Sequence, residues 1–107
     1  MFDLLKNKNS ISMKEAEKEL QQDPSIVLVD VRSRQEYREV HIPNSLNIPL
    51  DQIKMIQEKI RDKNSRLFVY CLSGGRSATA CMYLEKMGYT DVTNIGGISK
   101  WTGEIER

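Results

Sequence analysis

The sequence predicts an α/β protein with a mainly parallel central sheet of about five strands and helices on both faces. Short runs of apolar and β-branched residues at positions 26–29, 67–70 and 92–95 are typical of buried strands. Amphipathic segments separate these runs, so strands and helices alternate along the chain. This alternation favours parallel strands that are joined by helical crossovers.

Two capping-box motifs mark helix starts in the first half of the chain. Each pairs a serine with a glutamate three residues later, an arrangement that satisfies backbone N–H groups at the start of a helix. The pairs are Ser12 with Glu15 and Ser33 with Glu36. They predict a helix over residues 13–22, which Pro24 ends, and a short helix over residues 33–38.

The second half of the chain predicts the remaining elements. Residues 46–48 form a brief extended segment that Pro49 ends. A stripe of isoleucines at positions 53, 56 and 60 predicts a helix over residues 51–61. Then follow the strand at 67–70, a helix at 77–87 that Gly88 ends, the strand at 92–95 and a short helix carrying Trp101.

Length and composition bound the kind of protein. The 107 residues fit one domain, 1–107, with a core of about residues 10–102. The net charge of +1 gives no electrostatic reason to expect nucleic acid or a membrane surface as a partner. Residues 1–10 lack the features of a secretory signal, so we expect a cytoplasmic protein with two free thiols.

The most informative stretch follows the strand at 67–70. Cys71 comes directly after this strand, and a loop with two glycines leads into the next helix. The N–H groups of such a loop, with the positive end of the helix, can converge into an anion-binding nest. A thiol in that nest has its pKa lowered and becomes a nucleophile. The loop consists of Leu72, Ser73, Gly74, Gly75, Arg76 and Ser77.

Each loop residue type has an expected role. Gly74 and Gly75 allow the positive φ angles that a tight loop requires. Arg76 adds a positive charge for an anionic substrate. The alternative for Cys71 is a core cysteine at a strand end, because free cysteines are often buried. The neighbouring glycines, arginine and helix start favour the nucleophile.

Three ordered motifs make the chain resemble the rhodanese family from about residue 10 to residue 101. They are the loop Cys71-x-x-Gly74-x-Arg76, the segment Tyr37-x-x-x-His41-Ile42-Pro43 preceded by Asp30-Val31-Arg32, and the segment Asn94-Ile95-Gly96-Gly97-Ile98-x-x-Trp101. One departure is Asn44-Ser45, where the family usually has Gly-Ala.

The resemblance implies a single rhodanese-like domain with sulfurtransferase activity. Cys71 would take the sulfane sulfur of an anionic donor such as thiosulfate, and the loop N–H groups would hold the terminal sulfur of the resulting persulfide. A thiol, a protein cysteine or cyanide would then accept that sulfur. Arg76 would bind the sulfonate of the donor, and Ser73 and Ser77 could donate hydroxyl hydrogen bonds. The resemblance calls for no metal, cofactor, nucleic acid or membrane.

Two other functions remain open on the same fold. Phosphatases and arsenate reductases of this fold carry a C-x5-R loop, whereas the spacing from Cys71 to Arg76 is C-x4-R. The smaller loop suits a single sulfur atom better than a phosphoryl group. The second alternative is a non-catalytic interaction or sensing module, although inactive members typically lack the cysteine that this chain retains.

Several other polar residues are interpreted as structural. His41, the single histidine of the chain, is expected to hydrogen-bond a neighbouring loop. Asp30 and Arg32 are expected to form an ion pair, and Glu36 to serve only in its capping box.

The second cysteine is interpreted as part of the core. Cys81 follows Cys71 by ten residues in the predicted helix, among residues that mark a packed face. A role as a resolving thiol for Cys71 is the alternative. Tyr70 precedes Cys71 on the strand and is expected to face the opposite side of the sheet.

Overall fold

The structure is a computed structural model that describes residues 10–107, so the secretory-signal prediction falls almost entirely outside the described residues. Four parallel strands form the sheet in the spatial order β2-β1-β3-β4. The strands are β1 (Val27–Asp30), β2 (Ser45–Asn47), β3 (Arg66–Cys71) and β4 (Asp91–Gly97). The predicted α/β class and parallel arrangement are confirmed.

The predicted count of about five strands was wrong. Two further segments approach other extended backbone, but each makes only an isolated bridge, between Ser10 and Asn94 and between His41 and Glu106. A single bridge does not extend into a ladder, so the described part of the chain has four strands.

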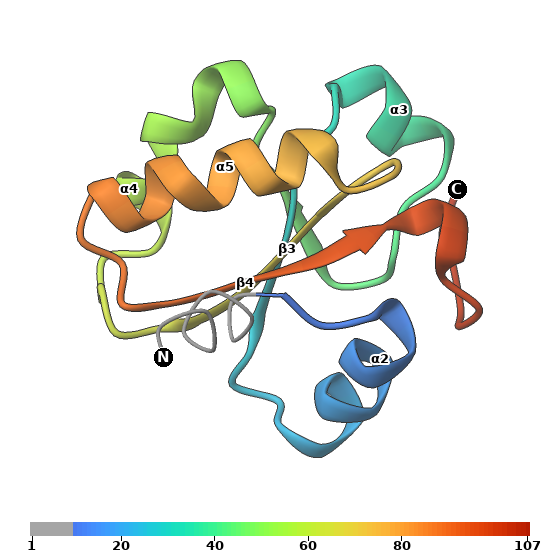
Figure 1. The fold of residues 1–107 in the computed structure, drawn as a ribbon. Coiled ribbons are helices and arrows are strands. Elements are labelled where there is room, and N and C mark those ends of the chain that lie inside the picture. Colours follow the sequence, from blue (N-terminus) through green and yellow to red (C-terminus); the bar gives the residue numbers. More distant parts are fainter. Residues whose placement is uncertain (1–9) are drawn as a thin grey trace.

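Helices cover both faces of the sheet, as predicted (Figure 1). Helices α4 (Ile56–Lys59) and α5 (Gly75–Lys86) lie on one face, and α2 (Met13–Gln22) lies on the other. The remaining helical segments are α3 (Arg34–Glu39) and the 3-10 helices η1 (Leu50–Met55) and η2 (Ile98–Lys100). Within residues 10–107, none of the helices is both long and apolar enough to cross a membrane.

Strand β3 divides its side chains between two hydrophobic cores. Leu67, Val69 and Cys71 belong to the core beneath α5, whereas Phe68 and Tyr70 belong to the core beneath α2. Successive side chains of a strand point to opposite faces, which explains this division. Tyr70 therefore faces away from Cys71, as expected.

The helix predicted over residues 51–61 is instead two short segments, η1 and α4. Gln52 has non-helical backbone angles (φ −120°, ψ 20°), and the N–H of Leu50 donates to Val31 O at 3.1 Å. This bond joins the start of the segment to the residue after β1, and the non-helical backbone of Gln52 is where a regular helix is interrupted. The isoleucine stripe is nevertheless buried, as its spacing predicts.

Candidate active site

The turn from β3 into α5 brings the predicted loop to the carboxyl edge of the sheet. Cys71 is the last residue of β3, and α5 begins at Gly75, two residues earlier than the sequence predicts. The carboxyl edge of a parallel sheet is where ligands bind in α/β proteins. The strand and the helix thus position the Cys71 side chain beside the N-terminal end of α5.

The Cys71 sulfur lies among hydrogen-bond donors of its own loop. Gly74 N–H donates to Sγ at 3.0 Å, Ser77 N–H donates at 3.4 Å, and Ser77 Oγ lies 3.4 Å from Sγ. Burial by itself raises the pKa of the thiol, but these groups and the N–H of Ser73 outweigh it. The pKa of Cys71 is therefore lowered, because hydrogen bonds to the thiolate favour the charged form.

Two glycines allow this loop geometry, and one of them was not predicted. Gly74 has φ +110°, as expected, but Gly75 is an ordinary first residue of α5 and not a positive-φ residue. The second glycine that the loop geometry requires is Gly97, where a Cβ atom would lie 1.9 Å from Leu72 O and 2.5 Å from Ser73 Cα. Strand β4 can approach the loop this closely only with glycine at position 97.

Asn94 is a site residue that the sequence reasoning missed. Its Oδ1 accepts the N–H of Gly96 at 2.9 Å and the Ser77 hydroxyl at 2.7 Å, and its Nδ2 donates to Gly74 O at 3.3 Å. Asn94 therefore joins β4 to the loop and to the start of α5. The signal that could have identified it was the polar amide side chain of Asn94 between Thr93 and Ile95, both of which are buried.

Arg76 and Glu36 are paired with each other, which corrects the expectation for Glu36. Arg76 Nη1 donates to Glu36 Oε1 at 2.8 Å, and Nη2 donates to Oε2 at 3.1 Å. Glu36 is therefore more than a capping residue, although it also forms the predicted box with Ser33. The charge of Arg76 is not free for a substrate in this structure. The residues lie on α5 and α3, which neighbour each other in Figure 1.

The outer part of the loop is open to solvent. Leu72 is 48% exposed although it directly follows the buried Cys71. Ser73 is also exposed, and Leu72 O accepts the N–H of Ser99 at 3.2 Å. A substrate that approaches Cys71 therefore meets an apolar side chain at the rim and N–H groups within the loop.

Cys81 lies in the hydrophobic core, as expected, and both cysteines are free thiols. Burial raises the pKa of Cys81 to about 12, and the charges of Glu85 and Cys71 add to the rise. Such a thiol is protonated at neutral pH, which disfavours the alternative role as a resolving nucleophile.

The other residues that were interpreted as structural make structural contacts. Arg32 pairs with the fully buried Asp30, with Nη2 at 2.7 Å from Oδ2. His41 Nδ1 lies 2.7 Å from Tyr37 O, and its ring stacks on that of Tyr37. Neither arrangement includes Cys71, so none of these side chains is a candidate for the chemistry.

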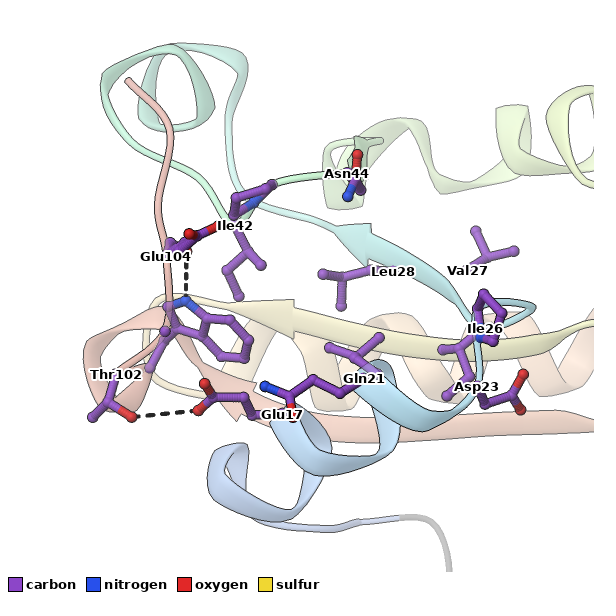
Figure 2. A pocket seen from close by; sticks show the side chains of 15 residues that line it. Glu17, Gln21, Asp23, Ile26, Val27, Leu28, Ile42, Asn44, Thr102 and Glu104 are labelled. Atoms are coloured by element: carbon purple, nitrogen blue, oxygen red, sulfur yellow. Dashed lines mark hydrogen bonds between the residues drawn. The ribbon is translucent and has the colours of Figure 1, made fainter.

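A groove beside α2, with a volume of about 1040 Å³, lies on the other side of the sheet (Figure 2). Trp101 and Ile42 contribute apolar surface, whereas Glu17, Asp23 and Glu104 contribute acidic groups. The lining residues include neither cysteine nor any basic side chain, so this groove does not fit an anionic sulfur donor. Among residues 10–107, no cluster of three or more His, Cys, Asp or Glu side chains could hold a metal ion.

Comparisons with known proteins agree on one family. The sequence model described as "Rhodanese-like domain" matches residues 12–104. The thiosulfate sulfurtransferase PspE of Escherichia coli is 41% identical over 71 residues, which are 65% of this chain and 68% of that protein. The adenylyltransferase and sulfurtransferase uba4 of Ogataea parapolymorpha is 38% identical over 80 residues, 74% of this chain.

The chain spans only 21% of the length of the Ogataea relative, so it resembles one part of that larger protein. Among solved structures, a rhodanese from E. coli, determined with anions, superposes with a TM-score of 0.72 and 35% sequence identity. That superposition covers 77% of this chain and 98% of the E. coli chain.

Proposed function

The chain belongs to the rhodanese-like domain family, and we propose that it transfers sulfane sulfur through a persulfide on Cys71. Relatives of the chain are sulfurtransferases. The observation that carries the proposal is the set of groups around Cys71 Sγ: the N–H groups of Gly74 and Ser77 donate to it, and Ser77 Oγ lies 3.4 Å away. They stabilise a thiolate without a histidine or a metal ion.

The first half-reaction loads the cysteine. The Cys71 thiolate attacks the outer sulfur of a donor such as thiosulfate, a new S–S bond forms, and the S–S bond of the donor breaks. Sulfite leaves with the electron pair of that bond, and the terminal sulfur on Cys71 carries the negative charge. The loop from Leu72 to Ser77, whose Gly74 and Ser77 N–H groups donate to Sγ, would hold this anionic sulfur.

The second half-reaction returns the cysteine to its resting state. A thiolate or cyanide attacks the terminal sulfur of the persulfide, and Cys71 leaves as a thiolate. A cyanide acceptor yields thiocyanate, and a thiol acceptor yields a new persulfide. The exposed rim at Leu72 supports access for a small thiol or a protein cysteine.

The protonation state of Glu36 distinguishes the proposed sulfur transfer from phosphatase chemistry. A phosphatase needs an acid that protonates the leaving group. The loop itself contains no acidic residue. Its acidic neighbour Glu36 is held by Arg76, and hydrogen bonds from Arg76 and Ser33 lower the pKa of Glu36 to about 2. A carboxylate of this kind cannot donate a proton at neutral pH.

Intact-protein mass spectrometry after incubation with thiosulfate tests the proposal. We expect the wild type to gain one sulfur atom that cyanide removes as thiocyanate. Cys71→Ser should gain none, and Cys81→Ala is the matched control that should still gain it. The same assay with mercaptopyruvate and glutathione persulfide separates a different donor from a binding module. No gain with any donor, or a gain that persists in Cys71→Ser, contradicts the proposal.

A further inference from the structure

The arginine of the proposed catalytic loop forms an ion pair with a carboxylate. The pairing of Arg76 with Glu36 uses both carboxylate oxygens and two guanidinium nitrogens, at 2.8 and 3.1 Å. Bidentate pairs of this type are the strongest and most directional that an arginine forms. Arg76 lies close enough to Cys71 for the two charges to interact. Glu36 therefore controls a charge that acts on the reacting sulfur.

The position of Glu36 is fixed by its own helix. Its Oε1 accepts the N–H of Ser33 at 2.9 Å, while its N–H donates to Ser33 Oγ at 3.2 Å. This capping box orients the carboxylate before any substrate arrives. The lowered pKa of Glu36, about 2, keeps it negatively charged at neutral pH.

This arrangement has opposite consequences for two classes of sulfur donor. Thiosulfate brings two negative charges to a thiolate, and a paired arginine offers little net attraction because the nearby carboxylate offsets its charge. A persulfide of a neutral thiol carries at most one negative charge, on the sulfur itself. Its carbon chain can also contact Leu72, which is 48% exposed at the rim.

We propose that Glu36 is a specificity-determining residue that holds Arg76 away from the donor, so that the site favours persulfides of thiols over doubly charged donors such as thiosulfate. This inference rests on the proposed sulfur transfer through Cys71. In the favoured reaction the Cys71 thiolate attacks the terminal sulfur of R–S–SH. The new S–S bond forms as the S–S bond of the donor breaks, and R–S⁻ leaves while the proton stays on the transferred sulfur.

The test is Glu36→Gln, because glutamine also serves in a capping box. Its oxygen, in the place of Oε1, can still accept the N–H of Ser33 and one N–H of Arg76, but its NH2 group, in the place of Oε2, cannot accept the second. The substitution therefore removes the negative charge that offsets Arg76, and one of the two hydrogen bonds, with little change at the start of α3. Glu39→Gln removes the same charge from the same helix at an exposed position that does not contact Arg76, and is the matched control.

Loading of Cys71 is measured by mass spectrometry with two donors, thiosulfate and the persulfide of 2-mercaptoethanol. In Glu36→Gln we expect the ratio of thiosulfate to persulfide loading efficiency to rise roughly tenfold, the effect of one freed charge near the donor. Glu39→Gln should leave the ratio at the wild-type value. Adding Arg76→Gln to Glu36→Gln should abolish the rise, because the effect acts through Arg76.

A binding measurement separates this inference from the proposed function. In a Cys71→Ser background, which cannot form a persulfide, Glu36→Gln should tighten thiosulfate binding roughly tenfold in calorimetry. If no donor of either assay loads the wild type, sulfur transfer fails as the function, and the thiosulfate affinity still decides whether Glu36 limits anion binding. An unchanged affinity, or an unchanged donor ratio in a protein that does load, overturns the inference.

Discussion

Cys71 and Cys81 are both buried in the same hydrophobic core, at 1% and 7% exposure, yet their surroundings have opposite effects on the thiol. The pKa of Cys71 is lowered by the hydrogen bonds of its loop, although burial opposes the shift. The pKa of Cys81 is raised to about 12, chiefly by burial. Exposure alone would not distinguish the two cysteines.

The difference comes from which backbone N–H groups are free. Cys81 lies within α5, where backbone N–H groups donate to carbonyls four residues earlier. Cys71 lies beside the N-terminal end of the same helix, where the first N–H groups have no partner within the helix. The N–H groups of Gly74 and Ser77 donate to Cys71 Sγ instead. One helix thus provides a reactive and an inert environment for a thiol.

The largest expected contrast is the rate of alkylation. At pH 8, iodoacetamide should modify Cys71 faster than Cys81 by a factor on the order of 10³ or more, because only the thiolate reacts. The Cys71 rate should rise with pH in proportion to the thiolate fraction, with a midpoint at lower pH than that of an ordinary cysteine, since its folded-state pKa is lowered. Peptide mapping by mass spectrometry gives both rates. Comparable rates in the native protein would contradict the assigned environments.

A substitution at Gly97 should make Cys71 less reactive, and so reduce its difference from Cys81, because it disturbs the loop. The alanine Cβ in Gly97→Ala would lie 1.9 Å from Leu72 O, so the backbone after Cys71 must move. We expect persulfide loading to fall about 100-fold, the effect of a displacement of about one ångström at a reacting group. The loading assay is run beside a thermal unfolding measurement.

Gly88→Ala is the control for that experiment. Gly88 also has a positive φ, +102°, and a Cβ there would meet nothing within 4 Å. It follows α5 at the end remote from Cys71. Alanine at position 88 should therefore lower the melting temperature through backbone strain while sulfur loading continues. A Gly97→Ala protein that loads sulfur as fast as Gly88→Ala would show that the close approach of β4 is dispensable.

The elements that the sequence predicts well are those that local patterns determine. The Ser33–Glu36 capping box, the N-cap at Ser12, the buried run before Cys71 and the opposite orientations of Tyr70 and Cys71 follow from spacing alone. The reciprocal bond of the Glu15 side chain, which a full box at Ser12 requires, is not formed. The helix predicted over residues 51–61 is interrupted at Gln52, whose non-helical backbone angles the spacing of the isoleucines does not reveal. The strand count of about five exceeded the four extended segments that the sequence itself indicates, and those four are the strands of the sheet.

The site was predictable where its residues are consecutive and not where they come from separate elements. The loop from Cys71 to Ser77 could be identified as one motif, with Gly74 in the expected conformation. The contact of Glu36 with Arg76 joins residues 40 positions apart, so each residue had only a local interpretation. Asn94 contacts Ser77 across 17 positions and depends on the register of β4 beside β3.

The smallest expected effect concerns the hydroxyl of Ser77, whose single proton has several acceptors within reach, two of them the carbonyls of Gly74 and Gly96. Asn94 Oδ1 lies at 2.7 Å and Cys71 Sγ at 3.4 Å. In the thiolate state the hydroxyl can donate to the sulfur, while Gly96 N–H still satisfies Asn94. Ser77→Ala should therefore raise the pKa of Cys71 and slow its alkylation at pH 7 roughly tenfold, the effect of one hydrogen bond to a charged group.

Thr79→Ala, which removes a hydroxyl bonded only to Gly75 O on the same helix, should leave the rate of Cys71 alkylation unchanged. Equal rates in the two variants would mean that the backbone N–H groups alone stabilise the thiolate and that Ser77 serves Asn94.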